Sequence, residues 1–311
     1  MGTPELPRFH HRDFSASALA DARGETTVSV CLPARDEAAT VGPIIEAIRV
    51  ALVERHAVID EIIVVDDHST DDTARLARDA GATVVEAASM LPEFGEGHGK
   101  GEALWKSVFA STGDVIAWCD SDILDFDVHF VTGLLGPLLC EPDIAFVKGH
   151  YERPLVDGGP GGGRVTELVA RPLLSLLFPH LAELVQPLSG EYAGRRSLLE
   201  RLPFVRGYGV DIGLLIDVAA SVGTGALAQV DLGTRLHRNR SLDQLSPQAM
   251  AVMQTALVRA GRQGLGDQAE LVRPGHDTVS VDVGERPPAV TVPGYGTRTD
   301  GVDPAGGAIG P

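Results

Sequence analysis

Between Thr26 and residue 122, short runs of β-branched residues alternate with longer stretches of helical pattern. The runs TVSVCLPA, EIIVVDD, ATVVEA and VIAWCDSD have the length and composition of strands, and helices are expected near Ala38, near Thr70 and after Lys100. This alternation is typical of βαβ units, whose consecutive strands join one parallel sheet. The first part of the chain is therefore predicted to be an α/β unit built on a parallel sheet.

Polar residues follow three of the predicted strands, in segments 33–37, 66–69 and 120–122. In open α/β sheets, ligands bind beyond the carboxyl ends of the strands. Asp67 leaves the buried run EIIVV at such an end, so we expect it to face a ligand as well as to precede a helix. The three segments together predict one binding site along this edge of the sheet.

The segment Asp120-Ser121-Asp122 predicts a site for a divalent metal and a sugar nucleotide. Two carboxylates separated by one residue at a strand end can hold a hard cation such as Mg²⁺, which prefers oxygen ligands and substrate phosphates. The cation would neutralise a diphosphate as it leaves. The alternative is that these residues only cap a turn, because Asp and Ser favour turn positions.

The glycine-rich segment 95–101 looks like a phosphate loop but lacks the required pattern, because Phe94 and Gly101 stand at two of its defined positions. A P-loop NTPase is therefore not expected. Lys100, close to the start of a helix, offers a positive charge to a phosphate or donor group. The alternative interpretation is an ordinary flexible loop.

Two further segments predict contacts with an anionic or metal ligand. His237 lies in the basic run RLHRNR, directly after an apolar strand-like segment, although a lone His is more often a surface or satisfied core residue. Arg164 and Thr166 follow a glycine-rich loop and open a helix, which suits a carboxylate or phosphate. Helix capping and surface charge are the alternatives for these two residues.

The composition changes along the chain and predicts four parts: a flexible N-terminus (1–25), a nucleotide-sugar-binding half (26–142), an acceptor-binding half (143–263) and a flexible Gly/Pro-rich tail (264–311). The formal net charge of −17 disfavours partners such as nucleic acid or an anionic membrane. No apolar run is long enough for a membrane span, and the polar N-terminus lacks a signal-peptide pattern. We therefore expect a cytoplasmic protein.

Taken together, the segments resemble the glucosyl-3-phosphoglycerate synthases of actinobacteria, a retaining family with the GT-A fold. The similarity spans about residues 26–245, and its combination of motifs is highly specific. The matching stretches are LPARDEAATV, VDDHSTDDT, GKGEALWKS, GDVIAWCDSD, GGGRVTELVARPLL, PLSGEYAGRR, PFVRGYGVDIGLLID and AQVDLGTRLHRNRSLDQL.

The resemblance implies a GT-A glycosyltransferase, with a Rossmann-like nucleotide-binding sheet and a C-terminal acceptor-binding region. It implies transfer of glucose from UDP-glucose to 3-phospho-D-glycerate with retention of the α configuration. The implied cofactor is Mg²⁺ or Mn²⁺, and a homodimer is the implied assembly.

The resemblance also implies roles for individual residues. Those implied for the nucleotide sugar are Pro33, Ala34, Arg35, Glu37, Asp67, Lys100, Asp120 and Ser121. Those implied for the metal are Asp122 and His237. Those implied for the acceptor are Gly163, Arg164, Thr166 and Asn239. Those implied to lie near the reacting sugar are Tyr208 and Asp211.

The chain departs from the family pattern at Asp211, where the motif YGVDIGLL replaces an expected YGVEIGLL. The carboxylate is one methylene shorter, and a displacement of about 1 Å can change a catalytic rate greatly. Arg35 and Asp67 likewise replace a more common apolar residue and Ser. These changes bear on the rate, the acceptor and the donor base.

Three alternatives stay open on the sequence. A related transferase could use GDP-mannose, GDP-glucose or a different small acidic acceptor. A nucleotidyltransferase shares the βαβ start, but CLPARDEA lacks the glycine- and arginine-rich signature that such enzymes carry after the first strand. The third alternative is a catalytically weak regulatory subunit that binds the nucleotide sugar.

Overall fold

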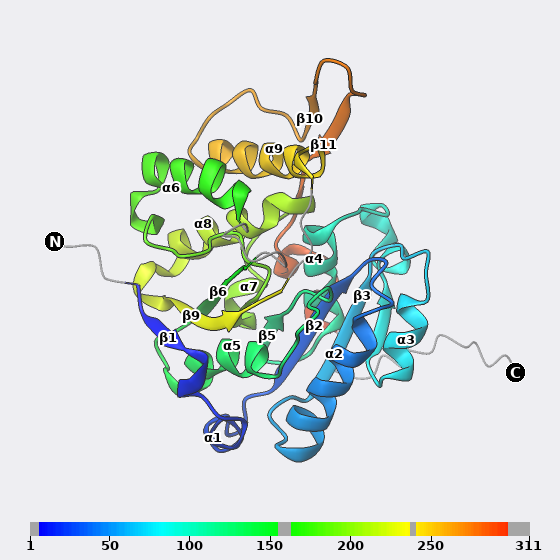
Figure 1. Ribbon diagram of the computed structural model, residues 1–311, viewed down its shortest axis with the longest axis vertical. Helices are drawn as coiled ribbons and strands as arrows, with labels where there is room; N and C mark the ends of the chain where they lie inside the picture. The colour runs from blue at the N-terminus through cyan, green and yellow to red at the C-terminus, as the bar shows by residue number, and fades with distance from the viewer. Residues whose placement is uncertain (1–5, 155–162, 237–240, 298–311) are drawn as a thin grey trace, which may run out of the picture.

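The structure, a computed structural model, describes residues 6–154, 163–236 and 241–297, and centres on an eight-stranded sheet (Figure 1). The strand order is β1-β9-β6-β7-β5-β2-β3-β4. Its strands are β1 (Arg8–His10), β2 (Val28–Ala34), β3 (Glu61–Asp66), β4 (Thr83–Glu86), β5 (Val115–Trp118), β6 (Phe146–Glu152), β7 (Tyr192–Arg195) and β9 (Leu227–Thr234). All neighbours run parallel except β7, which is antiparallel to both β5 and β6.

The strands β2, β3, β4 and β5 confirm the alternation read from the sequence. The helices between them are α2 (Val41–Ile48), α3 (Thr73–Asp79) and α4 (Lys100–Ala110). Side chains of β2 alternate between the two faces of the sheet. Val30 and Leu32 pack on one face, and Cys31 packs on the other. Both faces are covered, so the strands read as nearly continuous apolar runs.

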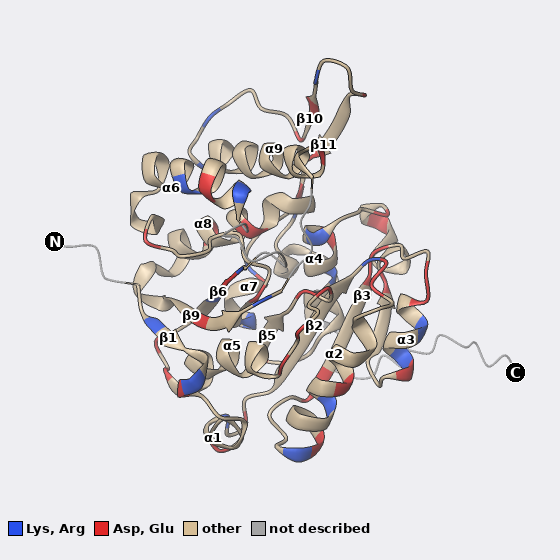
Figure 2. Ribbon diagram, viewed as in Figure 1, with Lys and Arg blue, Asp and Glu red and all other residues tan. Residues whose placement is uncertain are grey.

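Helices cover the two faces of the sheet and form two hydrophobic cores. The helices α1 (Ala16–Ala22), α2, α3 and α5 (His129–Cys140) contribute to one core. The other core includes side chains of α4, α6 (Arg171–Leu177), α7 (Arg196–Leu199), α8 (Val210–Val222) and α9 (Leu242–Arg259). Figure 2 shows charged residues of both signs on α3, as expected for a helix with one face in water.

Shorter helical segments connect these elements. The π-helical segments are η2 (Arg49–Arg55) and η5 (Thr166–Ala170). The 3-10 segments are η1 (His11–Asp13), η3 (Ala87–Ser89), η4 (Pro92–Phe94), η6 (Pro179–Leu181), η7 (Gly207–Gly209), η8 (Thr224–Ala226), η9 (Ala289–Thr291) and η10 (Tyr295–Thr297). Across the part of the chain that the structure describes, no helix is both long and apolar enough to cross a membrane.

Both ends of the chain contain short strands or helices in their described parts, and their flexibility stays a prediction from composition. Near the N-terminus, β1 pairs with β9 and α1 packs in a core. Beyond residue 264, β10 (Gln268–Leu271) pairs with β11 (Val279–Asp282), and β12 (Glu285–Arg286) pairs with β8 (Phe204–Val205). Glycine and proline residues beyond residue 264 interrupt any hydrophobic periodicity, but the short segments between them still pair as β-strands. The predicted division at residue 142 falls within one sheet and stays an interpretation.

A buried ion cluster attaches β12 to α4. The Glu102 carboxylate contacts the Arg286 guanidinium and the Lys106 ammonium, with Nε–Oε2 and Nζ–Oε1 distances of 2.5 and 2.9 Å. All three side chains are buried. Arg286 also donates to the carbonyl of Phe94 at 2.6 Å. The cluster therefore joins a segment near the C-terminus to the helix that begins at Lys100.

Replacing Arg286 with Met should lower the free energy of unfolding by about 3 kcal/mol, because it leaves the buried Glu102 with one cation instead of two. Urea denaturation at neutral pH measures this loss. The control is Arg75→Met, which removes an exposed partner of Asp72 and should lower the free energy of unfolding far less, because solvent screens that pair. Equal losses in the two variants would contradict the importance of the buried cluster.

Candidate active site

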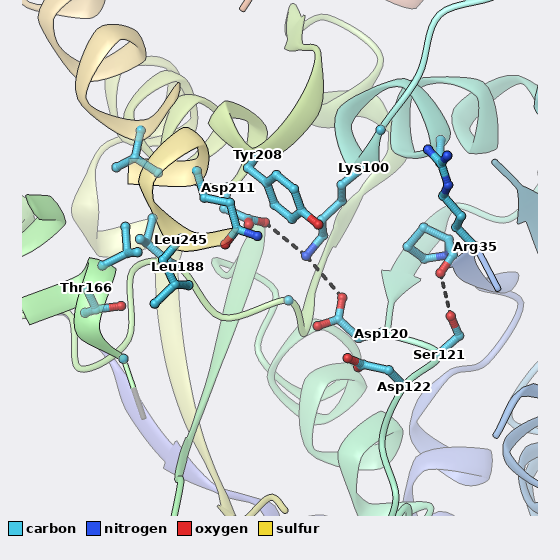
Figure 3. A pocket seen from close by; sticks show the side chains of 18 of the residues that line it. Arg35, Lys100, Asp120, Ser121, Asp122, Thr166, Leu188, Tyr208, Asp211 and Leu245 are labelled. Atoms are coloured by element: carbon cyan, nitrogen blue, oxygen red, sulfur yellow. Dashed lines mark hydrogen bonds and ion pairs between the residues drawn. The ribbon is translucent and has the colours of Figure 1, made fainter. Parts of the chain in front are cut away.

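A cavity of about 440 Å³ lies beyond the carboxyl ends of β2, β3 and β5, with η5, α8 and α9 on its other sides (Figure 3). Every predicted site residue that the structure describes lines it. These residues are Pro33, Ala34, Arg35, Glu37, Asp67, Lys100, Asp120, Ser121, Asp122, Gly163, Arg164, Thr166, Tyr208 and Asp211. The remaining two, His237 and Asn239, lie outside the described residues.

The loop after β5 is tied to the end of β2, which directs its two carboxylates to the cavity. Ser121 Oγ donates to the carbonyl of Pro33 at 2.7 Å, and Thr40 Oγ1 donates to the carbonyl of Ser121 at 2.6 Å. The middle residue of the segment is thus used for anchoring. Asp120 and Asp122 are left with side chains in the cavity, 25% and 41% exposed.

Lys100, the first residue of α4, bridges two carboxylates from distant parts of the chain. Its Nζ lies 3.1 Å from Asp120 Oδ1 and 3.3 Å from Asp211 Oδ1, as the dashed lines in Figure 3 mark. Tyr192 Oη donates to the same Asp211 oxygen at 3.1 Å. Burial alone would lower the pKa of Lys100, but the charges of Asp120 and Asp211 outweigh it and raise the pKa well above its ordinary value. Lys100 therefore carries a positive charge at neutral pH.

Arg235 is a buried cation that also contacts Asp120. From the sequence it was noted only as one of the basic residues in the run that contains His237. Its Nη1 lies 3.1 Å from Asp120 Oδ2 and 2.7 Å from Glu191 Oε1, and its Nη2 contacts Asp122. It also donates to the Tyr151 hydroxyl at 2.7 Å. Burial would lower the pKa of Arg235, but these acidic neighbours raise it well above its usual range. The available signal was its position directly after β9, at the carboxyl edge of the sheet.

Glu191 and Lys148 lie beneath the cavity and were missed by the sequence analysis. Glu191 precedes the antiparallel strand β7, whose first residues therefore meet the carboxyl ends of the parallel strands. Burial raises the pKa of Glu191 despite the opposing charge of Arg235. Lys148, in the middle of β6, donates to the carbonyl of Ser189 at 2.8 Å and lies 4.0 Å from the centre of the Tyr192 ring. Burial lowers the pKa of Lys148 to about 8.

At the end of β2 and β3, Asp67 connects the sheet to the loop before α4. Its Oδ2 accepts a hydrogen bond from the backbone N–H of Gly99 at 2.8 Å, directly before Lys100. Arg35 Nη1 lies 3.9 Å from the same oxygen, and its side chain is 57% exposed. Arg35 and Glu37 line the cavity beside Asp67. This end of the cavity therefore combines exposed polar groups with an ordered loop that positions Lys100.

At the opposite end, the start of η5 faces the cavity with Gly163, Arg164 and Thr166. Gly163 has a φ of +82°, a left-handed conformation that glycine adopts at little cost. Arg153 lines the same end and donates to the Tyr151 hydroxyl at 2.7 Å. A helix start with two arginines is suited to an anion. Sequence analysis missed Arg153 because nothing in ERPL marks it locally.

Tyr208 and Asp211 enter the cavity from η7 and the first turn of α8. The Tyr208 side chain is exposed, while Asp211 is buried beside Lys100. Figure 3 shows both side chains next to Lys100, with Asp120 on its other side. The cavity therefore has a charged centre, and the two ends described above lie on either side of it.

Comparisons with known proteins agree with this architecture. Residues 29–155 match the model of the family described as Glycosyl transferase family 2. The glucosyl-3-phosphoglycerate synthase of Petrotoga mobilis is 42% identical, over 92% of this chain and 94% of its own. The chain belongs to the glucosyl-3-phosphoglycerate synthase family. It therefore belongs to a family of glycosyltransferases, as its motifs predicted.

Solved structures support the membership of this synthase family. The glucosyl-3-phosphoglycerate synthase of Mycobacterium tuberculosis is 44% identical, with a TM-score of 0.84, over 93% of this chain and 99% of that one. The mannosyl-3-phosphoglycerate synthase of Rubrobacter xylanophilus is 39% identical, with a TM-score of 0.82, over 92% and 97% of the two chains. The fold is thus shared between synthases named for different sugars.

The low pKa of the buried Lys148 predicts how the free energy of unfolding changes with pH. Its pKa is about 8 when folded and about 10.5 when unfolded, so the unfolded chain binds more protons between these pH values. The contribution of Lys148 to stability should therefore rise with pH across this window, by up to about 3 kcal/mol. We expect the free energy of unfolding of the wild type minus that of Lys148→Met to increase from pH 7.5 to pH 10. A constant or falling difference would contradict the low pKa.

Proposed function

We propose that the chain transfers glucose from UDP-glucose to 3-phospho-D-glycerate, giving glucosyl-3-phosphoglycerate with retention of the α configuration. The observation that carries the proposal is one cavity with paired carboxylates, a partly buried lysine between two of its carboxylates, and an end lined by two arginines. The relative from M. tuberculosis was solved with Mn²⁺, UDP-glucose and phosphoglyceric acid. Charged, phosphorylated substrates of this kind lead us to propose a cytoplasmic location.

We assign the nucleotide to the end of the cavity formed by β2 and β3. The residues assigned to it are Pro33, Ala34, Arg35, Glu37 and Asp67. Ligands of open α/β sheets bind at such strand ends, which supports the assignment. Lys100 follows the loop that Asp67 holds, so its charge lies between the nucleotide end and the centre of the cavity.

The residues after β5 fit a divalent cation. Asp120 and Asp122 present carboxylate oxygens, which hard cations such as Mg²⁺ and Mn²⁺ prefer. Both carboxylates form ion pairs with Arg235, so this place already favours positive charge. A bound cation of this kind would supply positive charge to the diphosphate leaving group. His237 stays a predicted ligand from the sequence.

We assign the acceptor to the end formed by the start of η5. Gly163, Arg164 and Thr166 offer backbone and side-chain donors, and Arg153 adds a second guanidinium. The phosphate and carboxylate of 3-phospho-D-glycerate are both anions, so two guanidinium groups complement them. Asn239 stays a predicted contact from the sequence.

The reaction breaks the bond between the anomeric carbon of glucose and the β-phosphate oxygen, which leaves with the electron pair. The anomeric carbon bonds to the acceptor hydroxyl oxygen, and the proton of that hydroxyl passes to the departing phosphate oxygen. We propose that Lys100 stabilises the negative charge that develops on the departing phosphate. We propose that Asp211, held by Lys100 and Tyr192, accepts a hydrogen bond from a sugar or acceptor hydroxyl and orients it.

A transferase that uses a mannose donor is the second candidate function. The observation that favours it is the similarity to the mannosyl-3-phosphoglycerate synthase of R. xylanophilus. Arg35 and Asp67, which line the nucleotide end, also differ from the residues that we expect more often in the glucosyl family. The regulatory-subunit and nucleotidyltransferase hypotheses gain no support from these relatives.

A donor and acceptor panel tests the proposal directly. With Mg²⁺ and 3-phosphoglycerate present, we expect UDP release from UDP-glucose to exceed GDP release from GDP-mannose or GDP-glucose. Omitting 3-phosphoglycerate or adding EDTA should abolish the release, because the transfer needs the acceptor and the metal. Turnover only with GDP-mannose would show that the proposed donor is wrong. UDP release at the same rate without 3-phosphoglycerate would show that the proposed acceptor is wrong.

Replacing Asp211 with Asn should lower kcat about 100-fold, because the amide keeps the shape but loses the charge that Lys100 and a substrate hydroxyl require. The measurement is steady-state UDP release at saturating substrates. Asp79→Asn is the matched control, since Asp79 is exposed on α3 and pairs only with Arg75 among the ion pairs described. Equal kcat values for the wild type and Asp211→Asn would remove Asp211 from the proposed chemistry.

A further inference from the structure

A group of three potential metal ligands lies at the nucleotide end of the cavity and is separate from Asp120 and Asp122. Asp67, His68 and His98 each offer one ligand atom, and these atoms all lie within 4.8 Å of one another. Asp67 Oδ1 is 3.0 Å from His68 Nδ1 and 4.0 Å from His98 Nδ1. The end of β3 and the loop before α4 bring them together.

The environment of His68 favours a ligand. Asp67 is buried and His68 is partly buried, whereas the His98 side chain is 57% exposed. His68 Nε2 is buried and has no hydrogen-bond partner among the described residues. The nitrogen beside Asp67 is Nδ1 and not Nε2, so the case for a metal site rests on the distances among Asp67, His68 and His98. The centroids of the two imidazole rings lie 4.1 Å apart.

The chemistry of two imidazoles and one carboxylate identifies the class of ion. Imidazole suits Zn²⁺ and neighbouring transition metals, while Mg²⁺ prefers an all-oxygen site. Bonds of about 2.0 to 2.1 Å to Zn²⁺ place tetrahedral ligand atoms about 3.3 Å apart. The exposed His98 can close the remaining distance by a change of side-chain rotamer, and the exposed Arg35 can turn away from Asp67.

We propose that Asp67, His68 and His98 form a Zn²⁺ site at the nucleotide end of the cavity, and that Zn²⁺ bound there weakens the binding of UDP-glucose. The second part rests on the function proposed above. Asp67 lines the cavity and holds the backbone N–H of Gly99 next to Lys100. A metal that takes up Asp67 removes it from the nucleotide and alters the loop that positions Lys100.

Calorimetric titration of the full chain with Zn²⁺ tests the site without any nucleotide. The wild type should show a binding event that is weakened about tenfold or more in His98→Ala and in His68→Asn. Asn suits position 68 because the φ of His68 is 62°, a left-handed conformation that Asn tolerates. His180→Ala, which removes another exposed imidazole, is the control and should bind as the wild type does. Unchanged binding in both cluster variants, or none in the wild type, would overturn the site.

The consequence for the donor is measured separately, with Mg²⁺ saturating. Zn²⁺ should raise the KM for UDP-glucose several-fold in the wild type and leave it unchanged in His98→Ala, whose activity without Zn²⁺ should equal that of the wild type. An unchanged KM while Zn²⁺ is bound would overturn the link to the donor. If the chain does not use UDP-glucose at all, the titration still decides whether the Zn²⁺ site exists.

Discussion

Two cations, the partly buried Lys100 and the buried Arg235, share the carboxylate of Asp120, and the arrangement of the site depends on this interaction. A charged group taken from water into the protein is costly unless an opposite charge meets it with good geometry. Lys100 also needs Asp211, and Arg235 also needs Glu191. The starts of α4, α8 and β7 and the ends of β5 and β9 must therefore converge on one place.

This convergence explains why charged side chains meet at the centre of the cavity, while different residues line its two ends. The centre carries Lys100 between the carboxylates of Asp120 and Asp211, whereas the start of η5 brings Gly163, Arg164 and Thr166 to the end that we assign to the acceptor. Segments remote from the cavity stabilise the same elements. The best example is Arg286, which lies in β12 and contacts Glu102 in the first turn of α4.

Much of the site could be read from the sequence, because parallel strands leave a local signal at their carboxyl ends. Asp67 and Asp120 follow apolar runs, and such runs end at the ligand edge of a parallel sheet. Glu191 could not be found in this way. It precedes β7, the antiparallel strand, so the amino end of its strand and not the carboxyl end lies at the ligand edge.

The sequence by itself determined the βαβ order, the strands from β2 to β5 and the positions of Asp120 and Asp122 after β5, because periodicity and strand ends are local properties. Only the tertiary structure decided that β7 inserts between β5 and β6, that Arg235 lies between Asp120 and Glu191, and that residues beyond 264 pair with β8 and α4. These contacts join residues far apart in the chain. Their free energy comes from burying charges in pairs, and no short stretch of sequence encodes the partner.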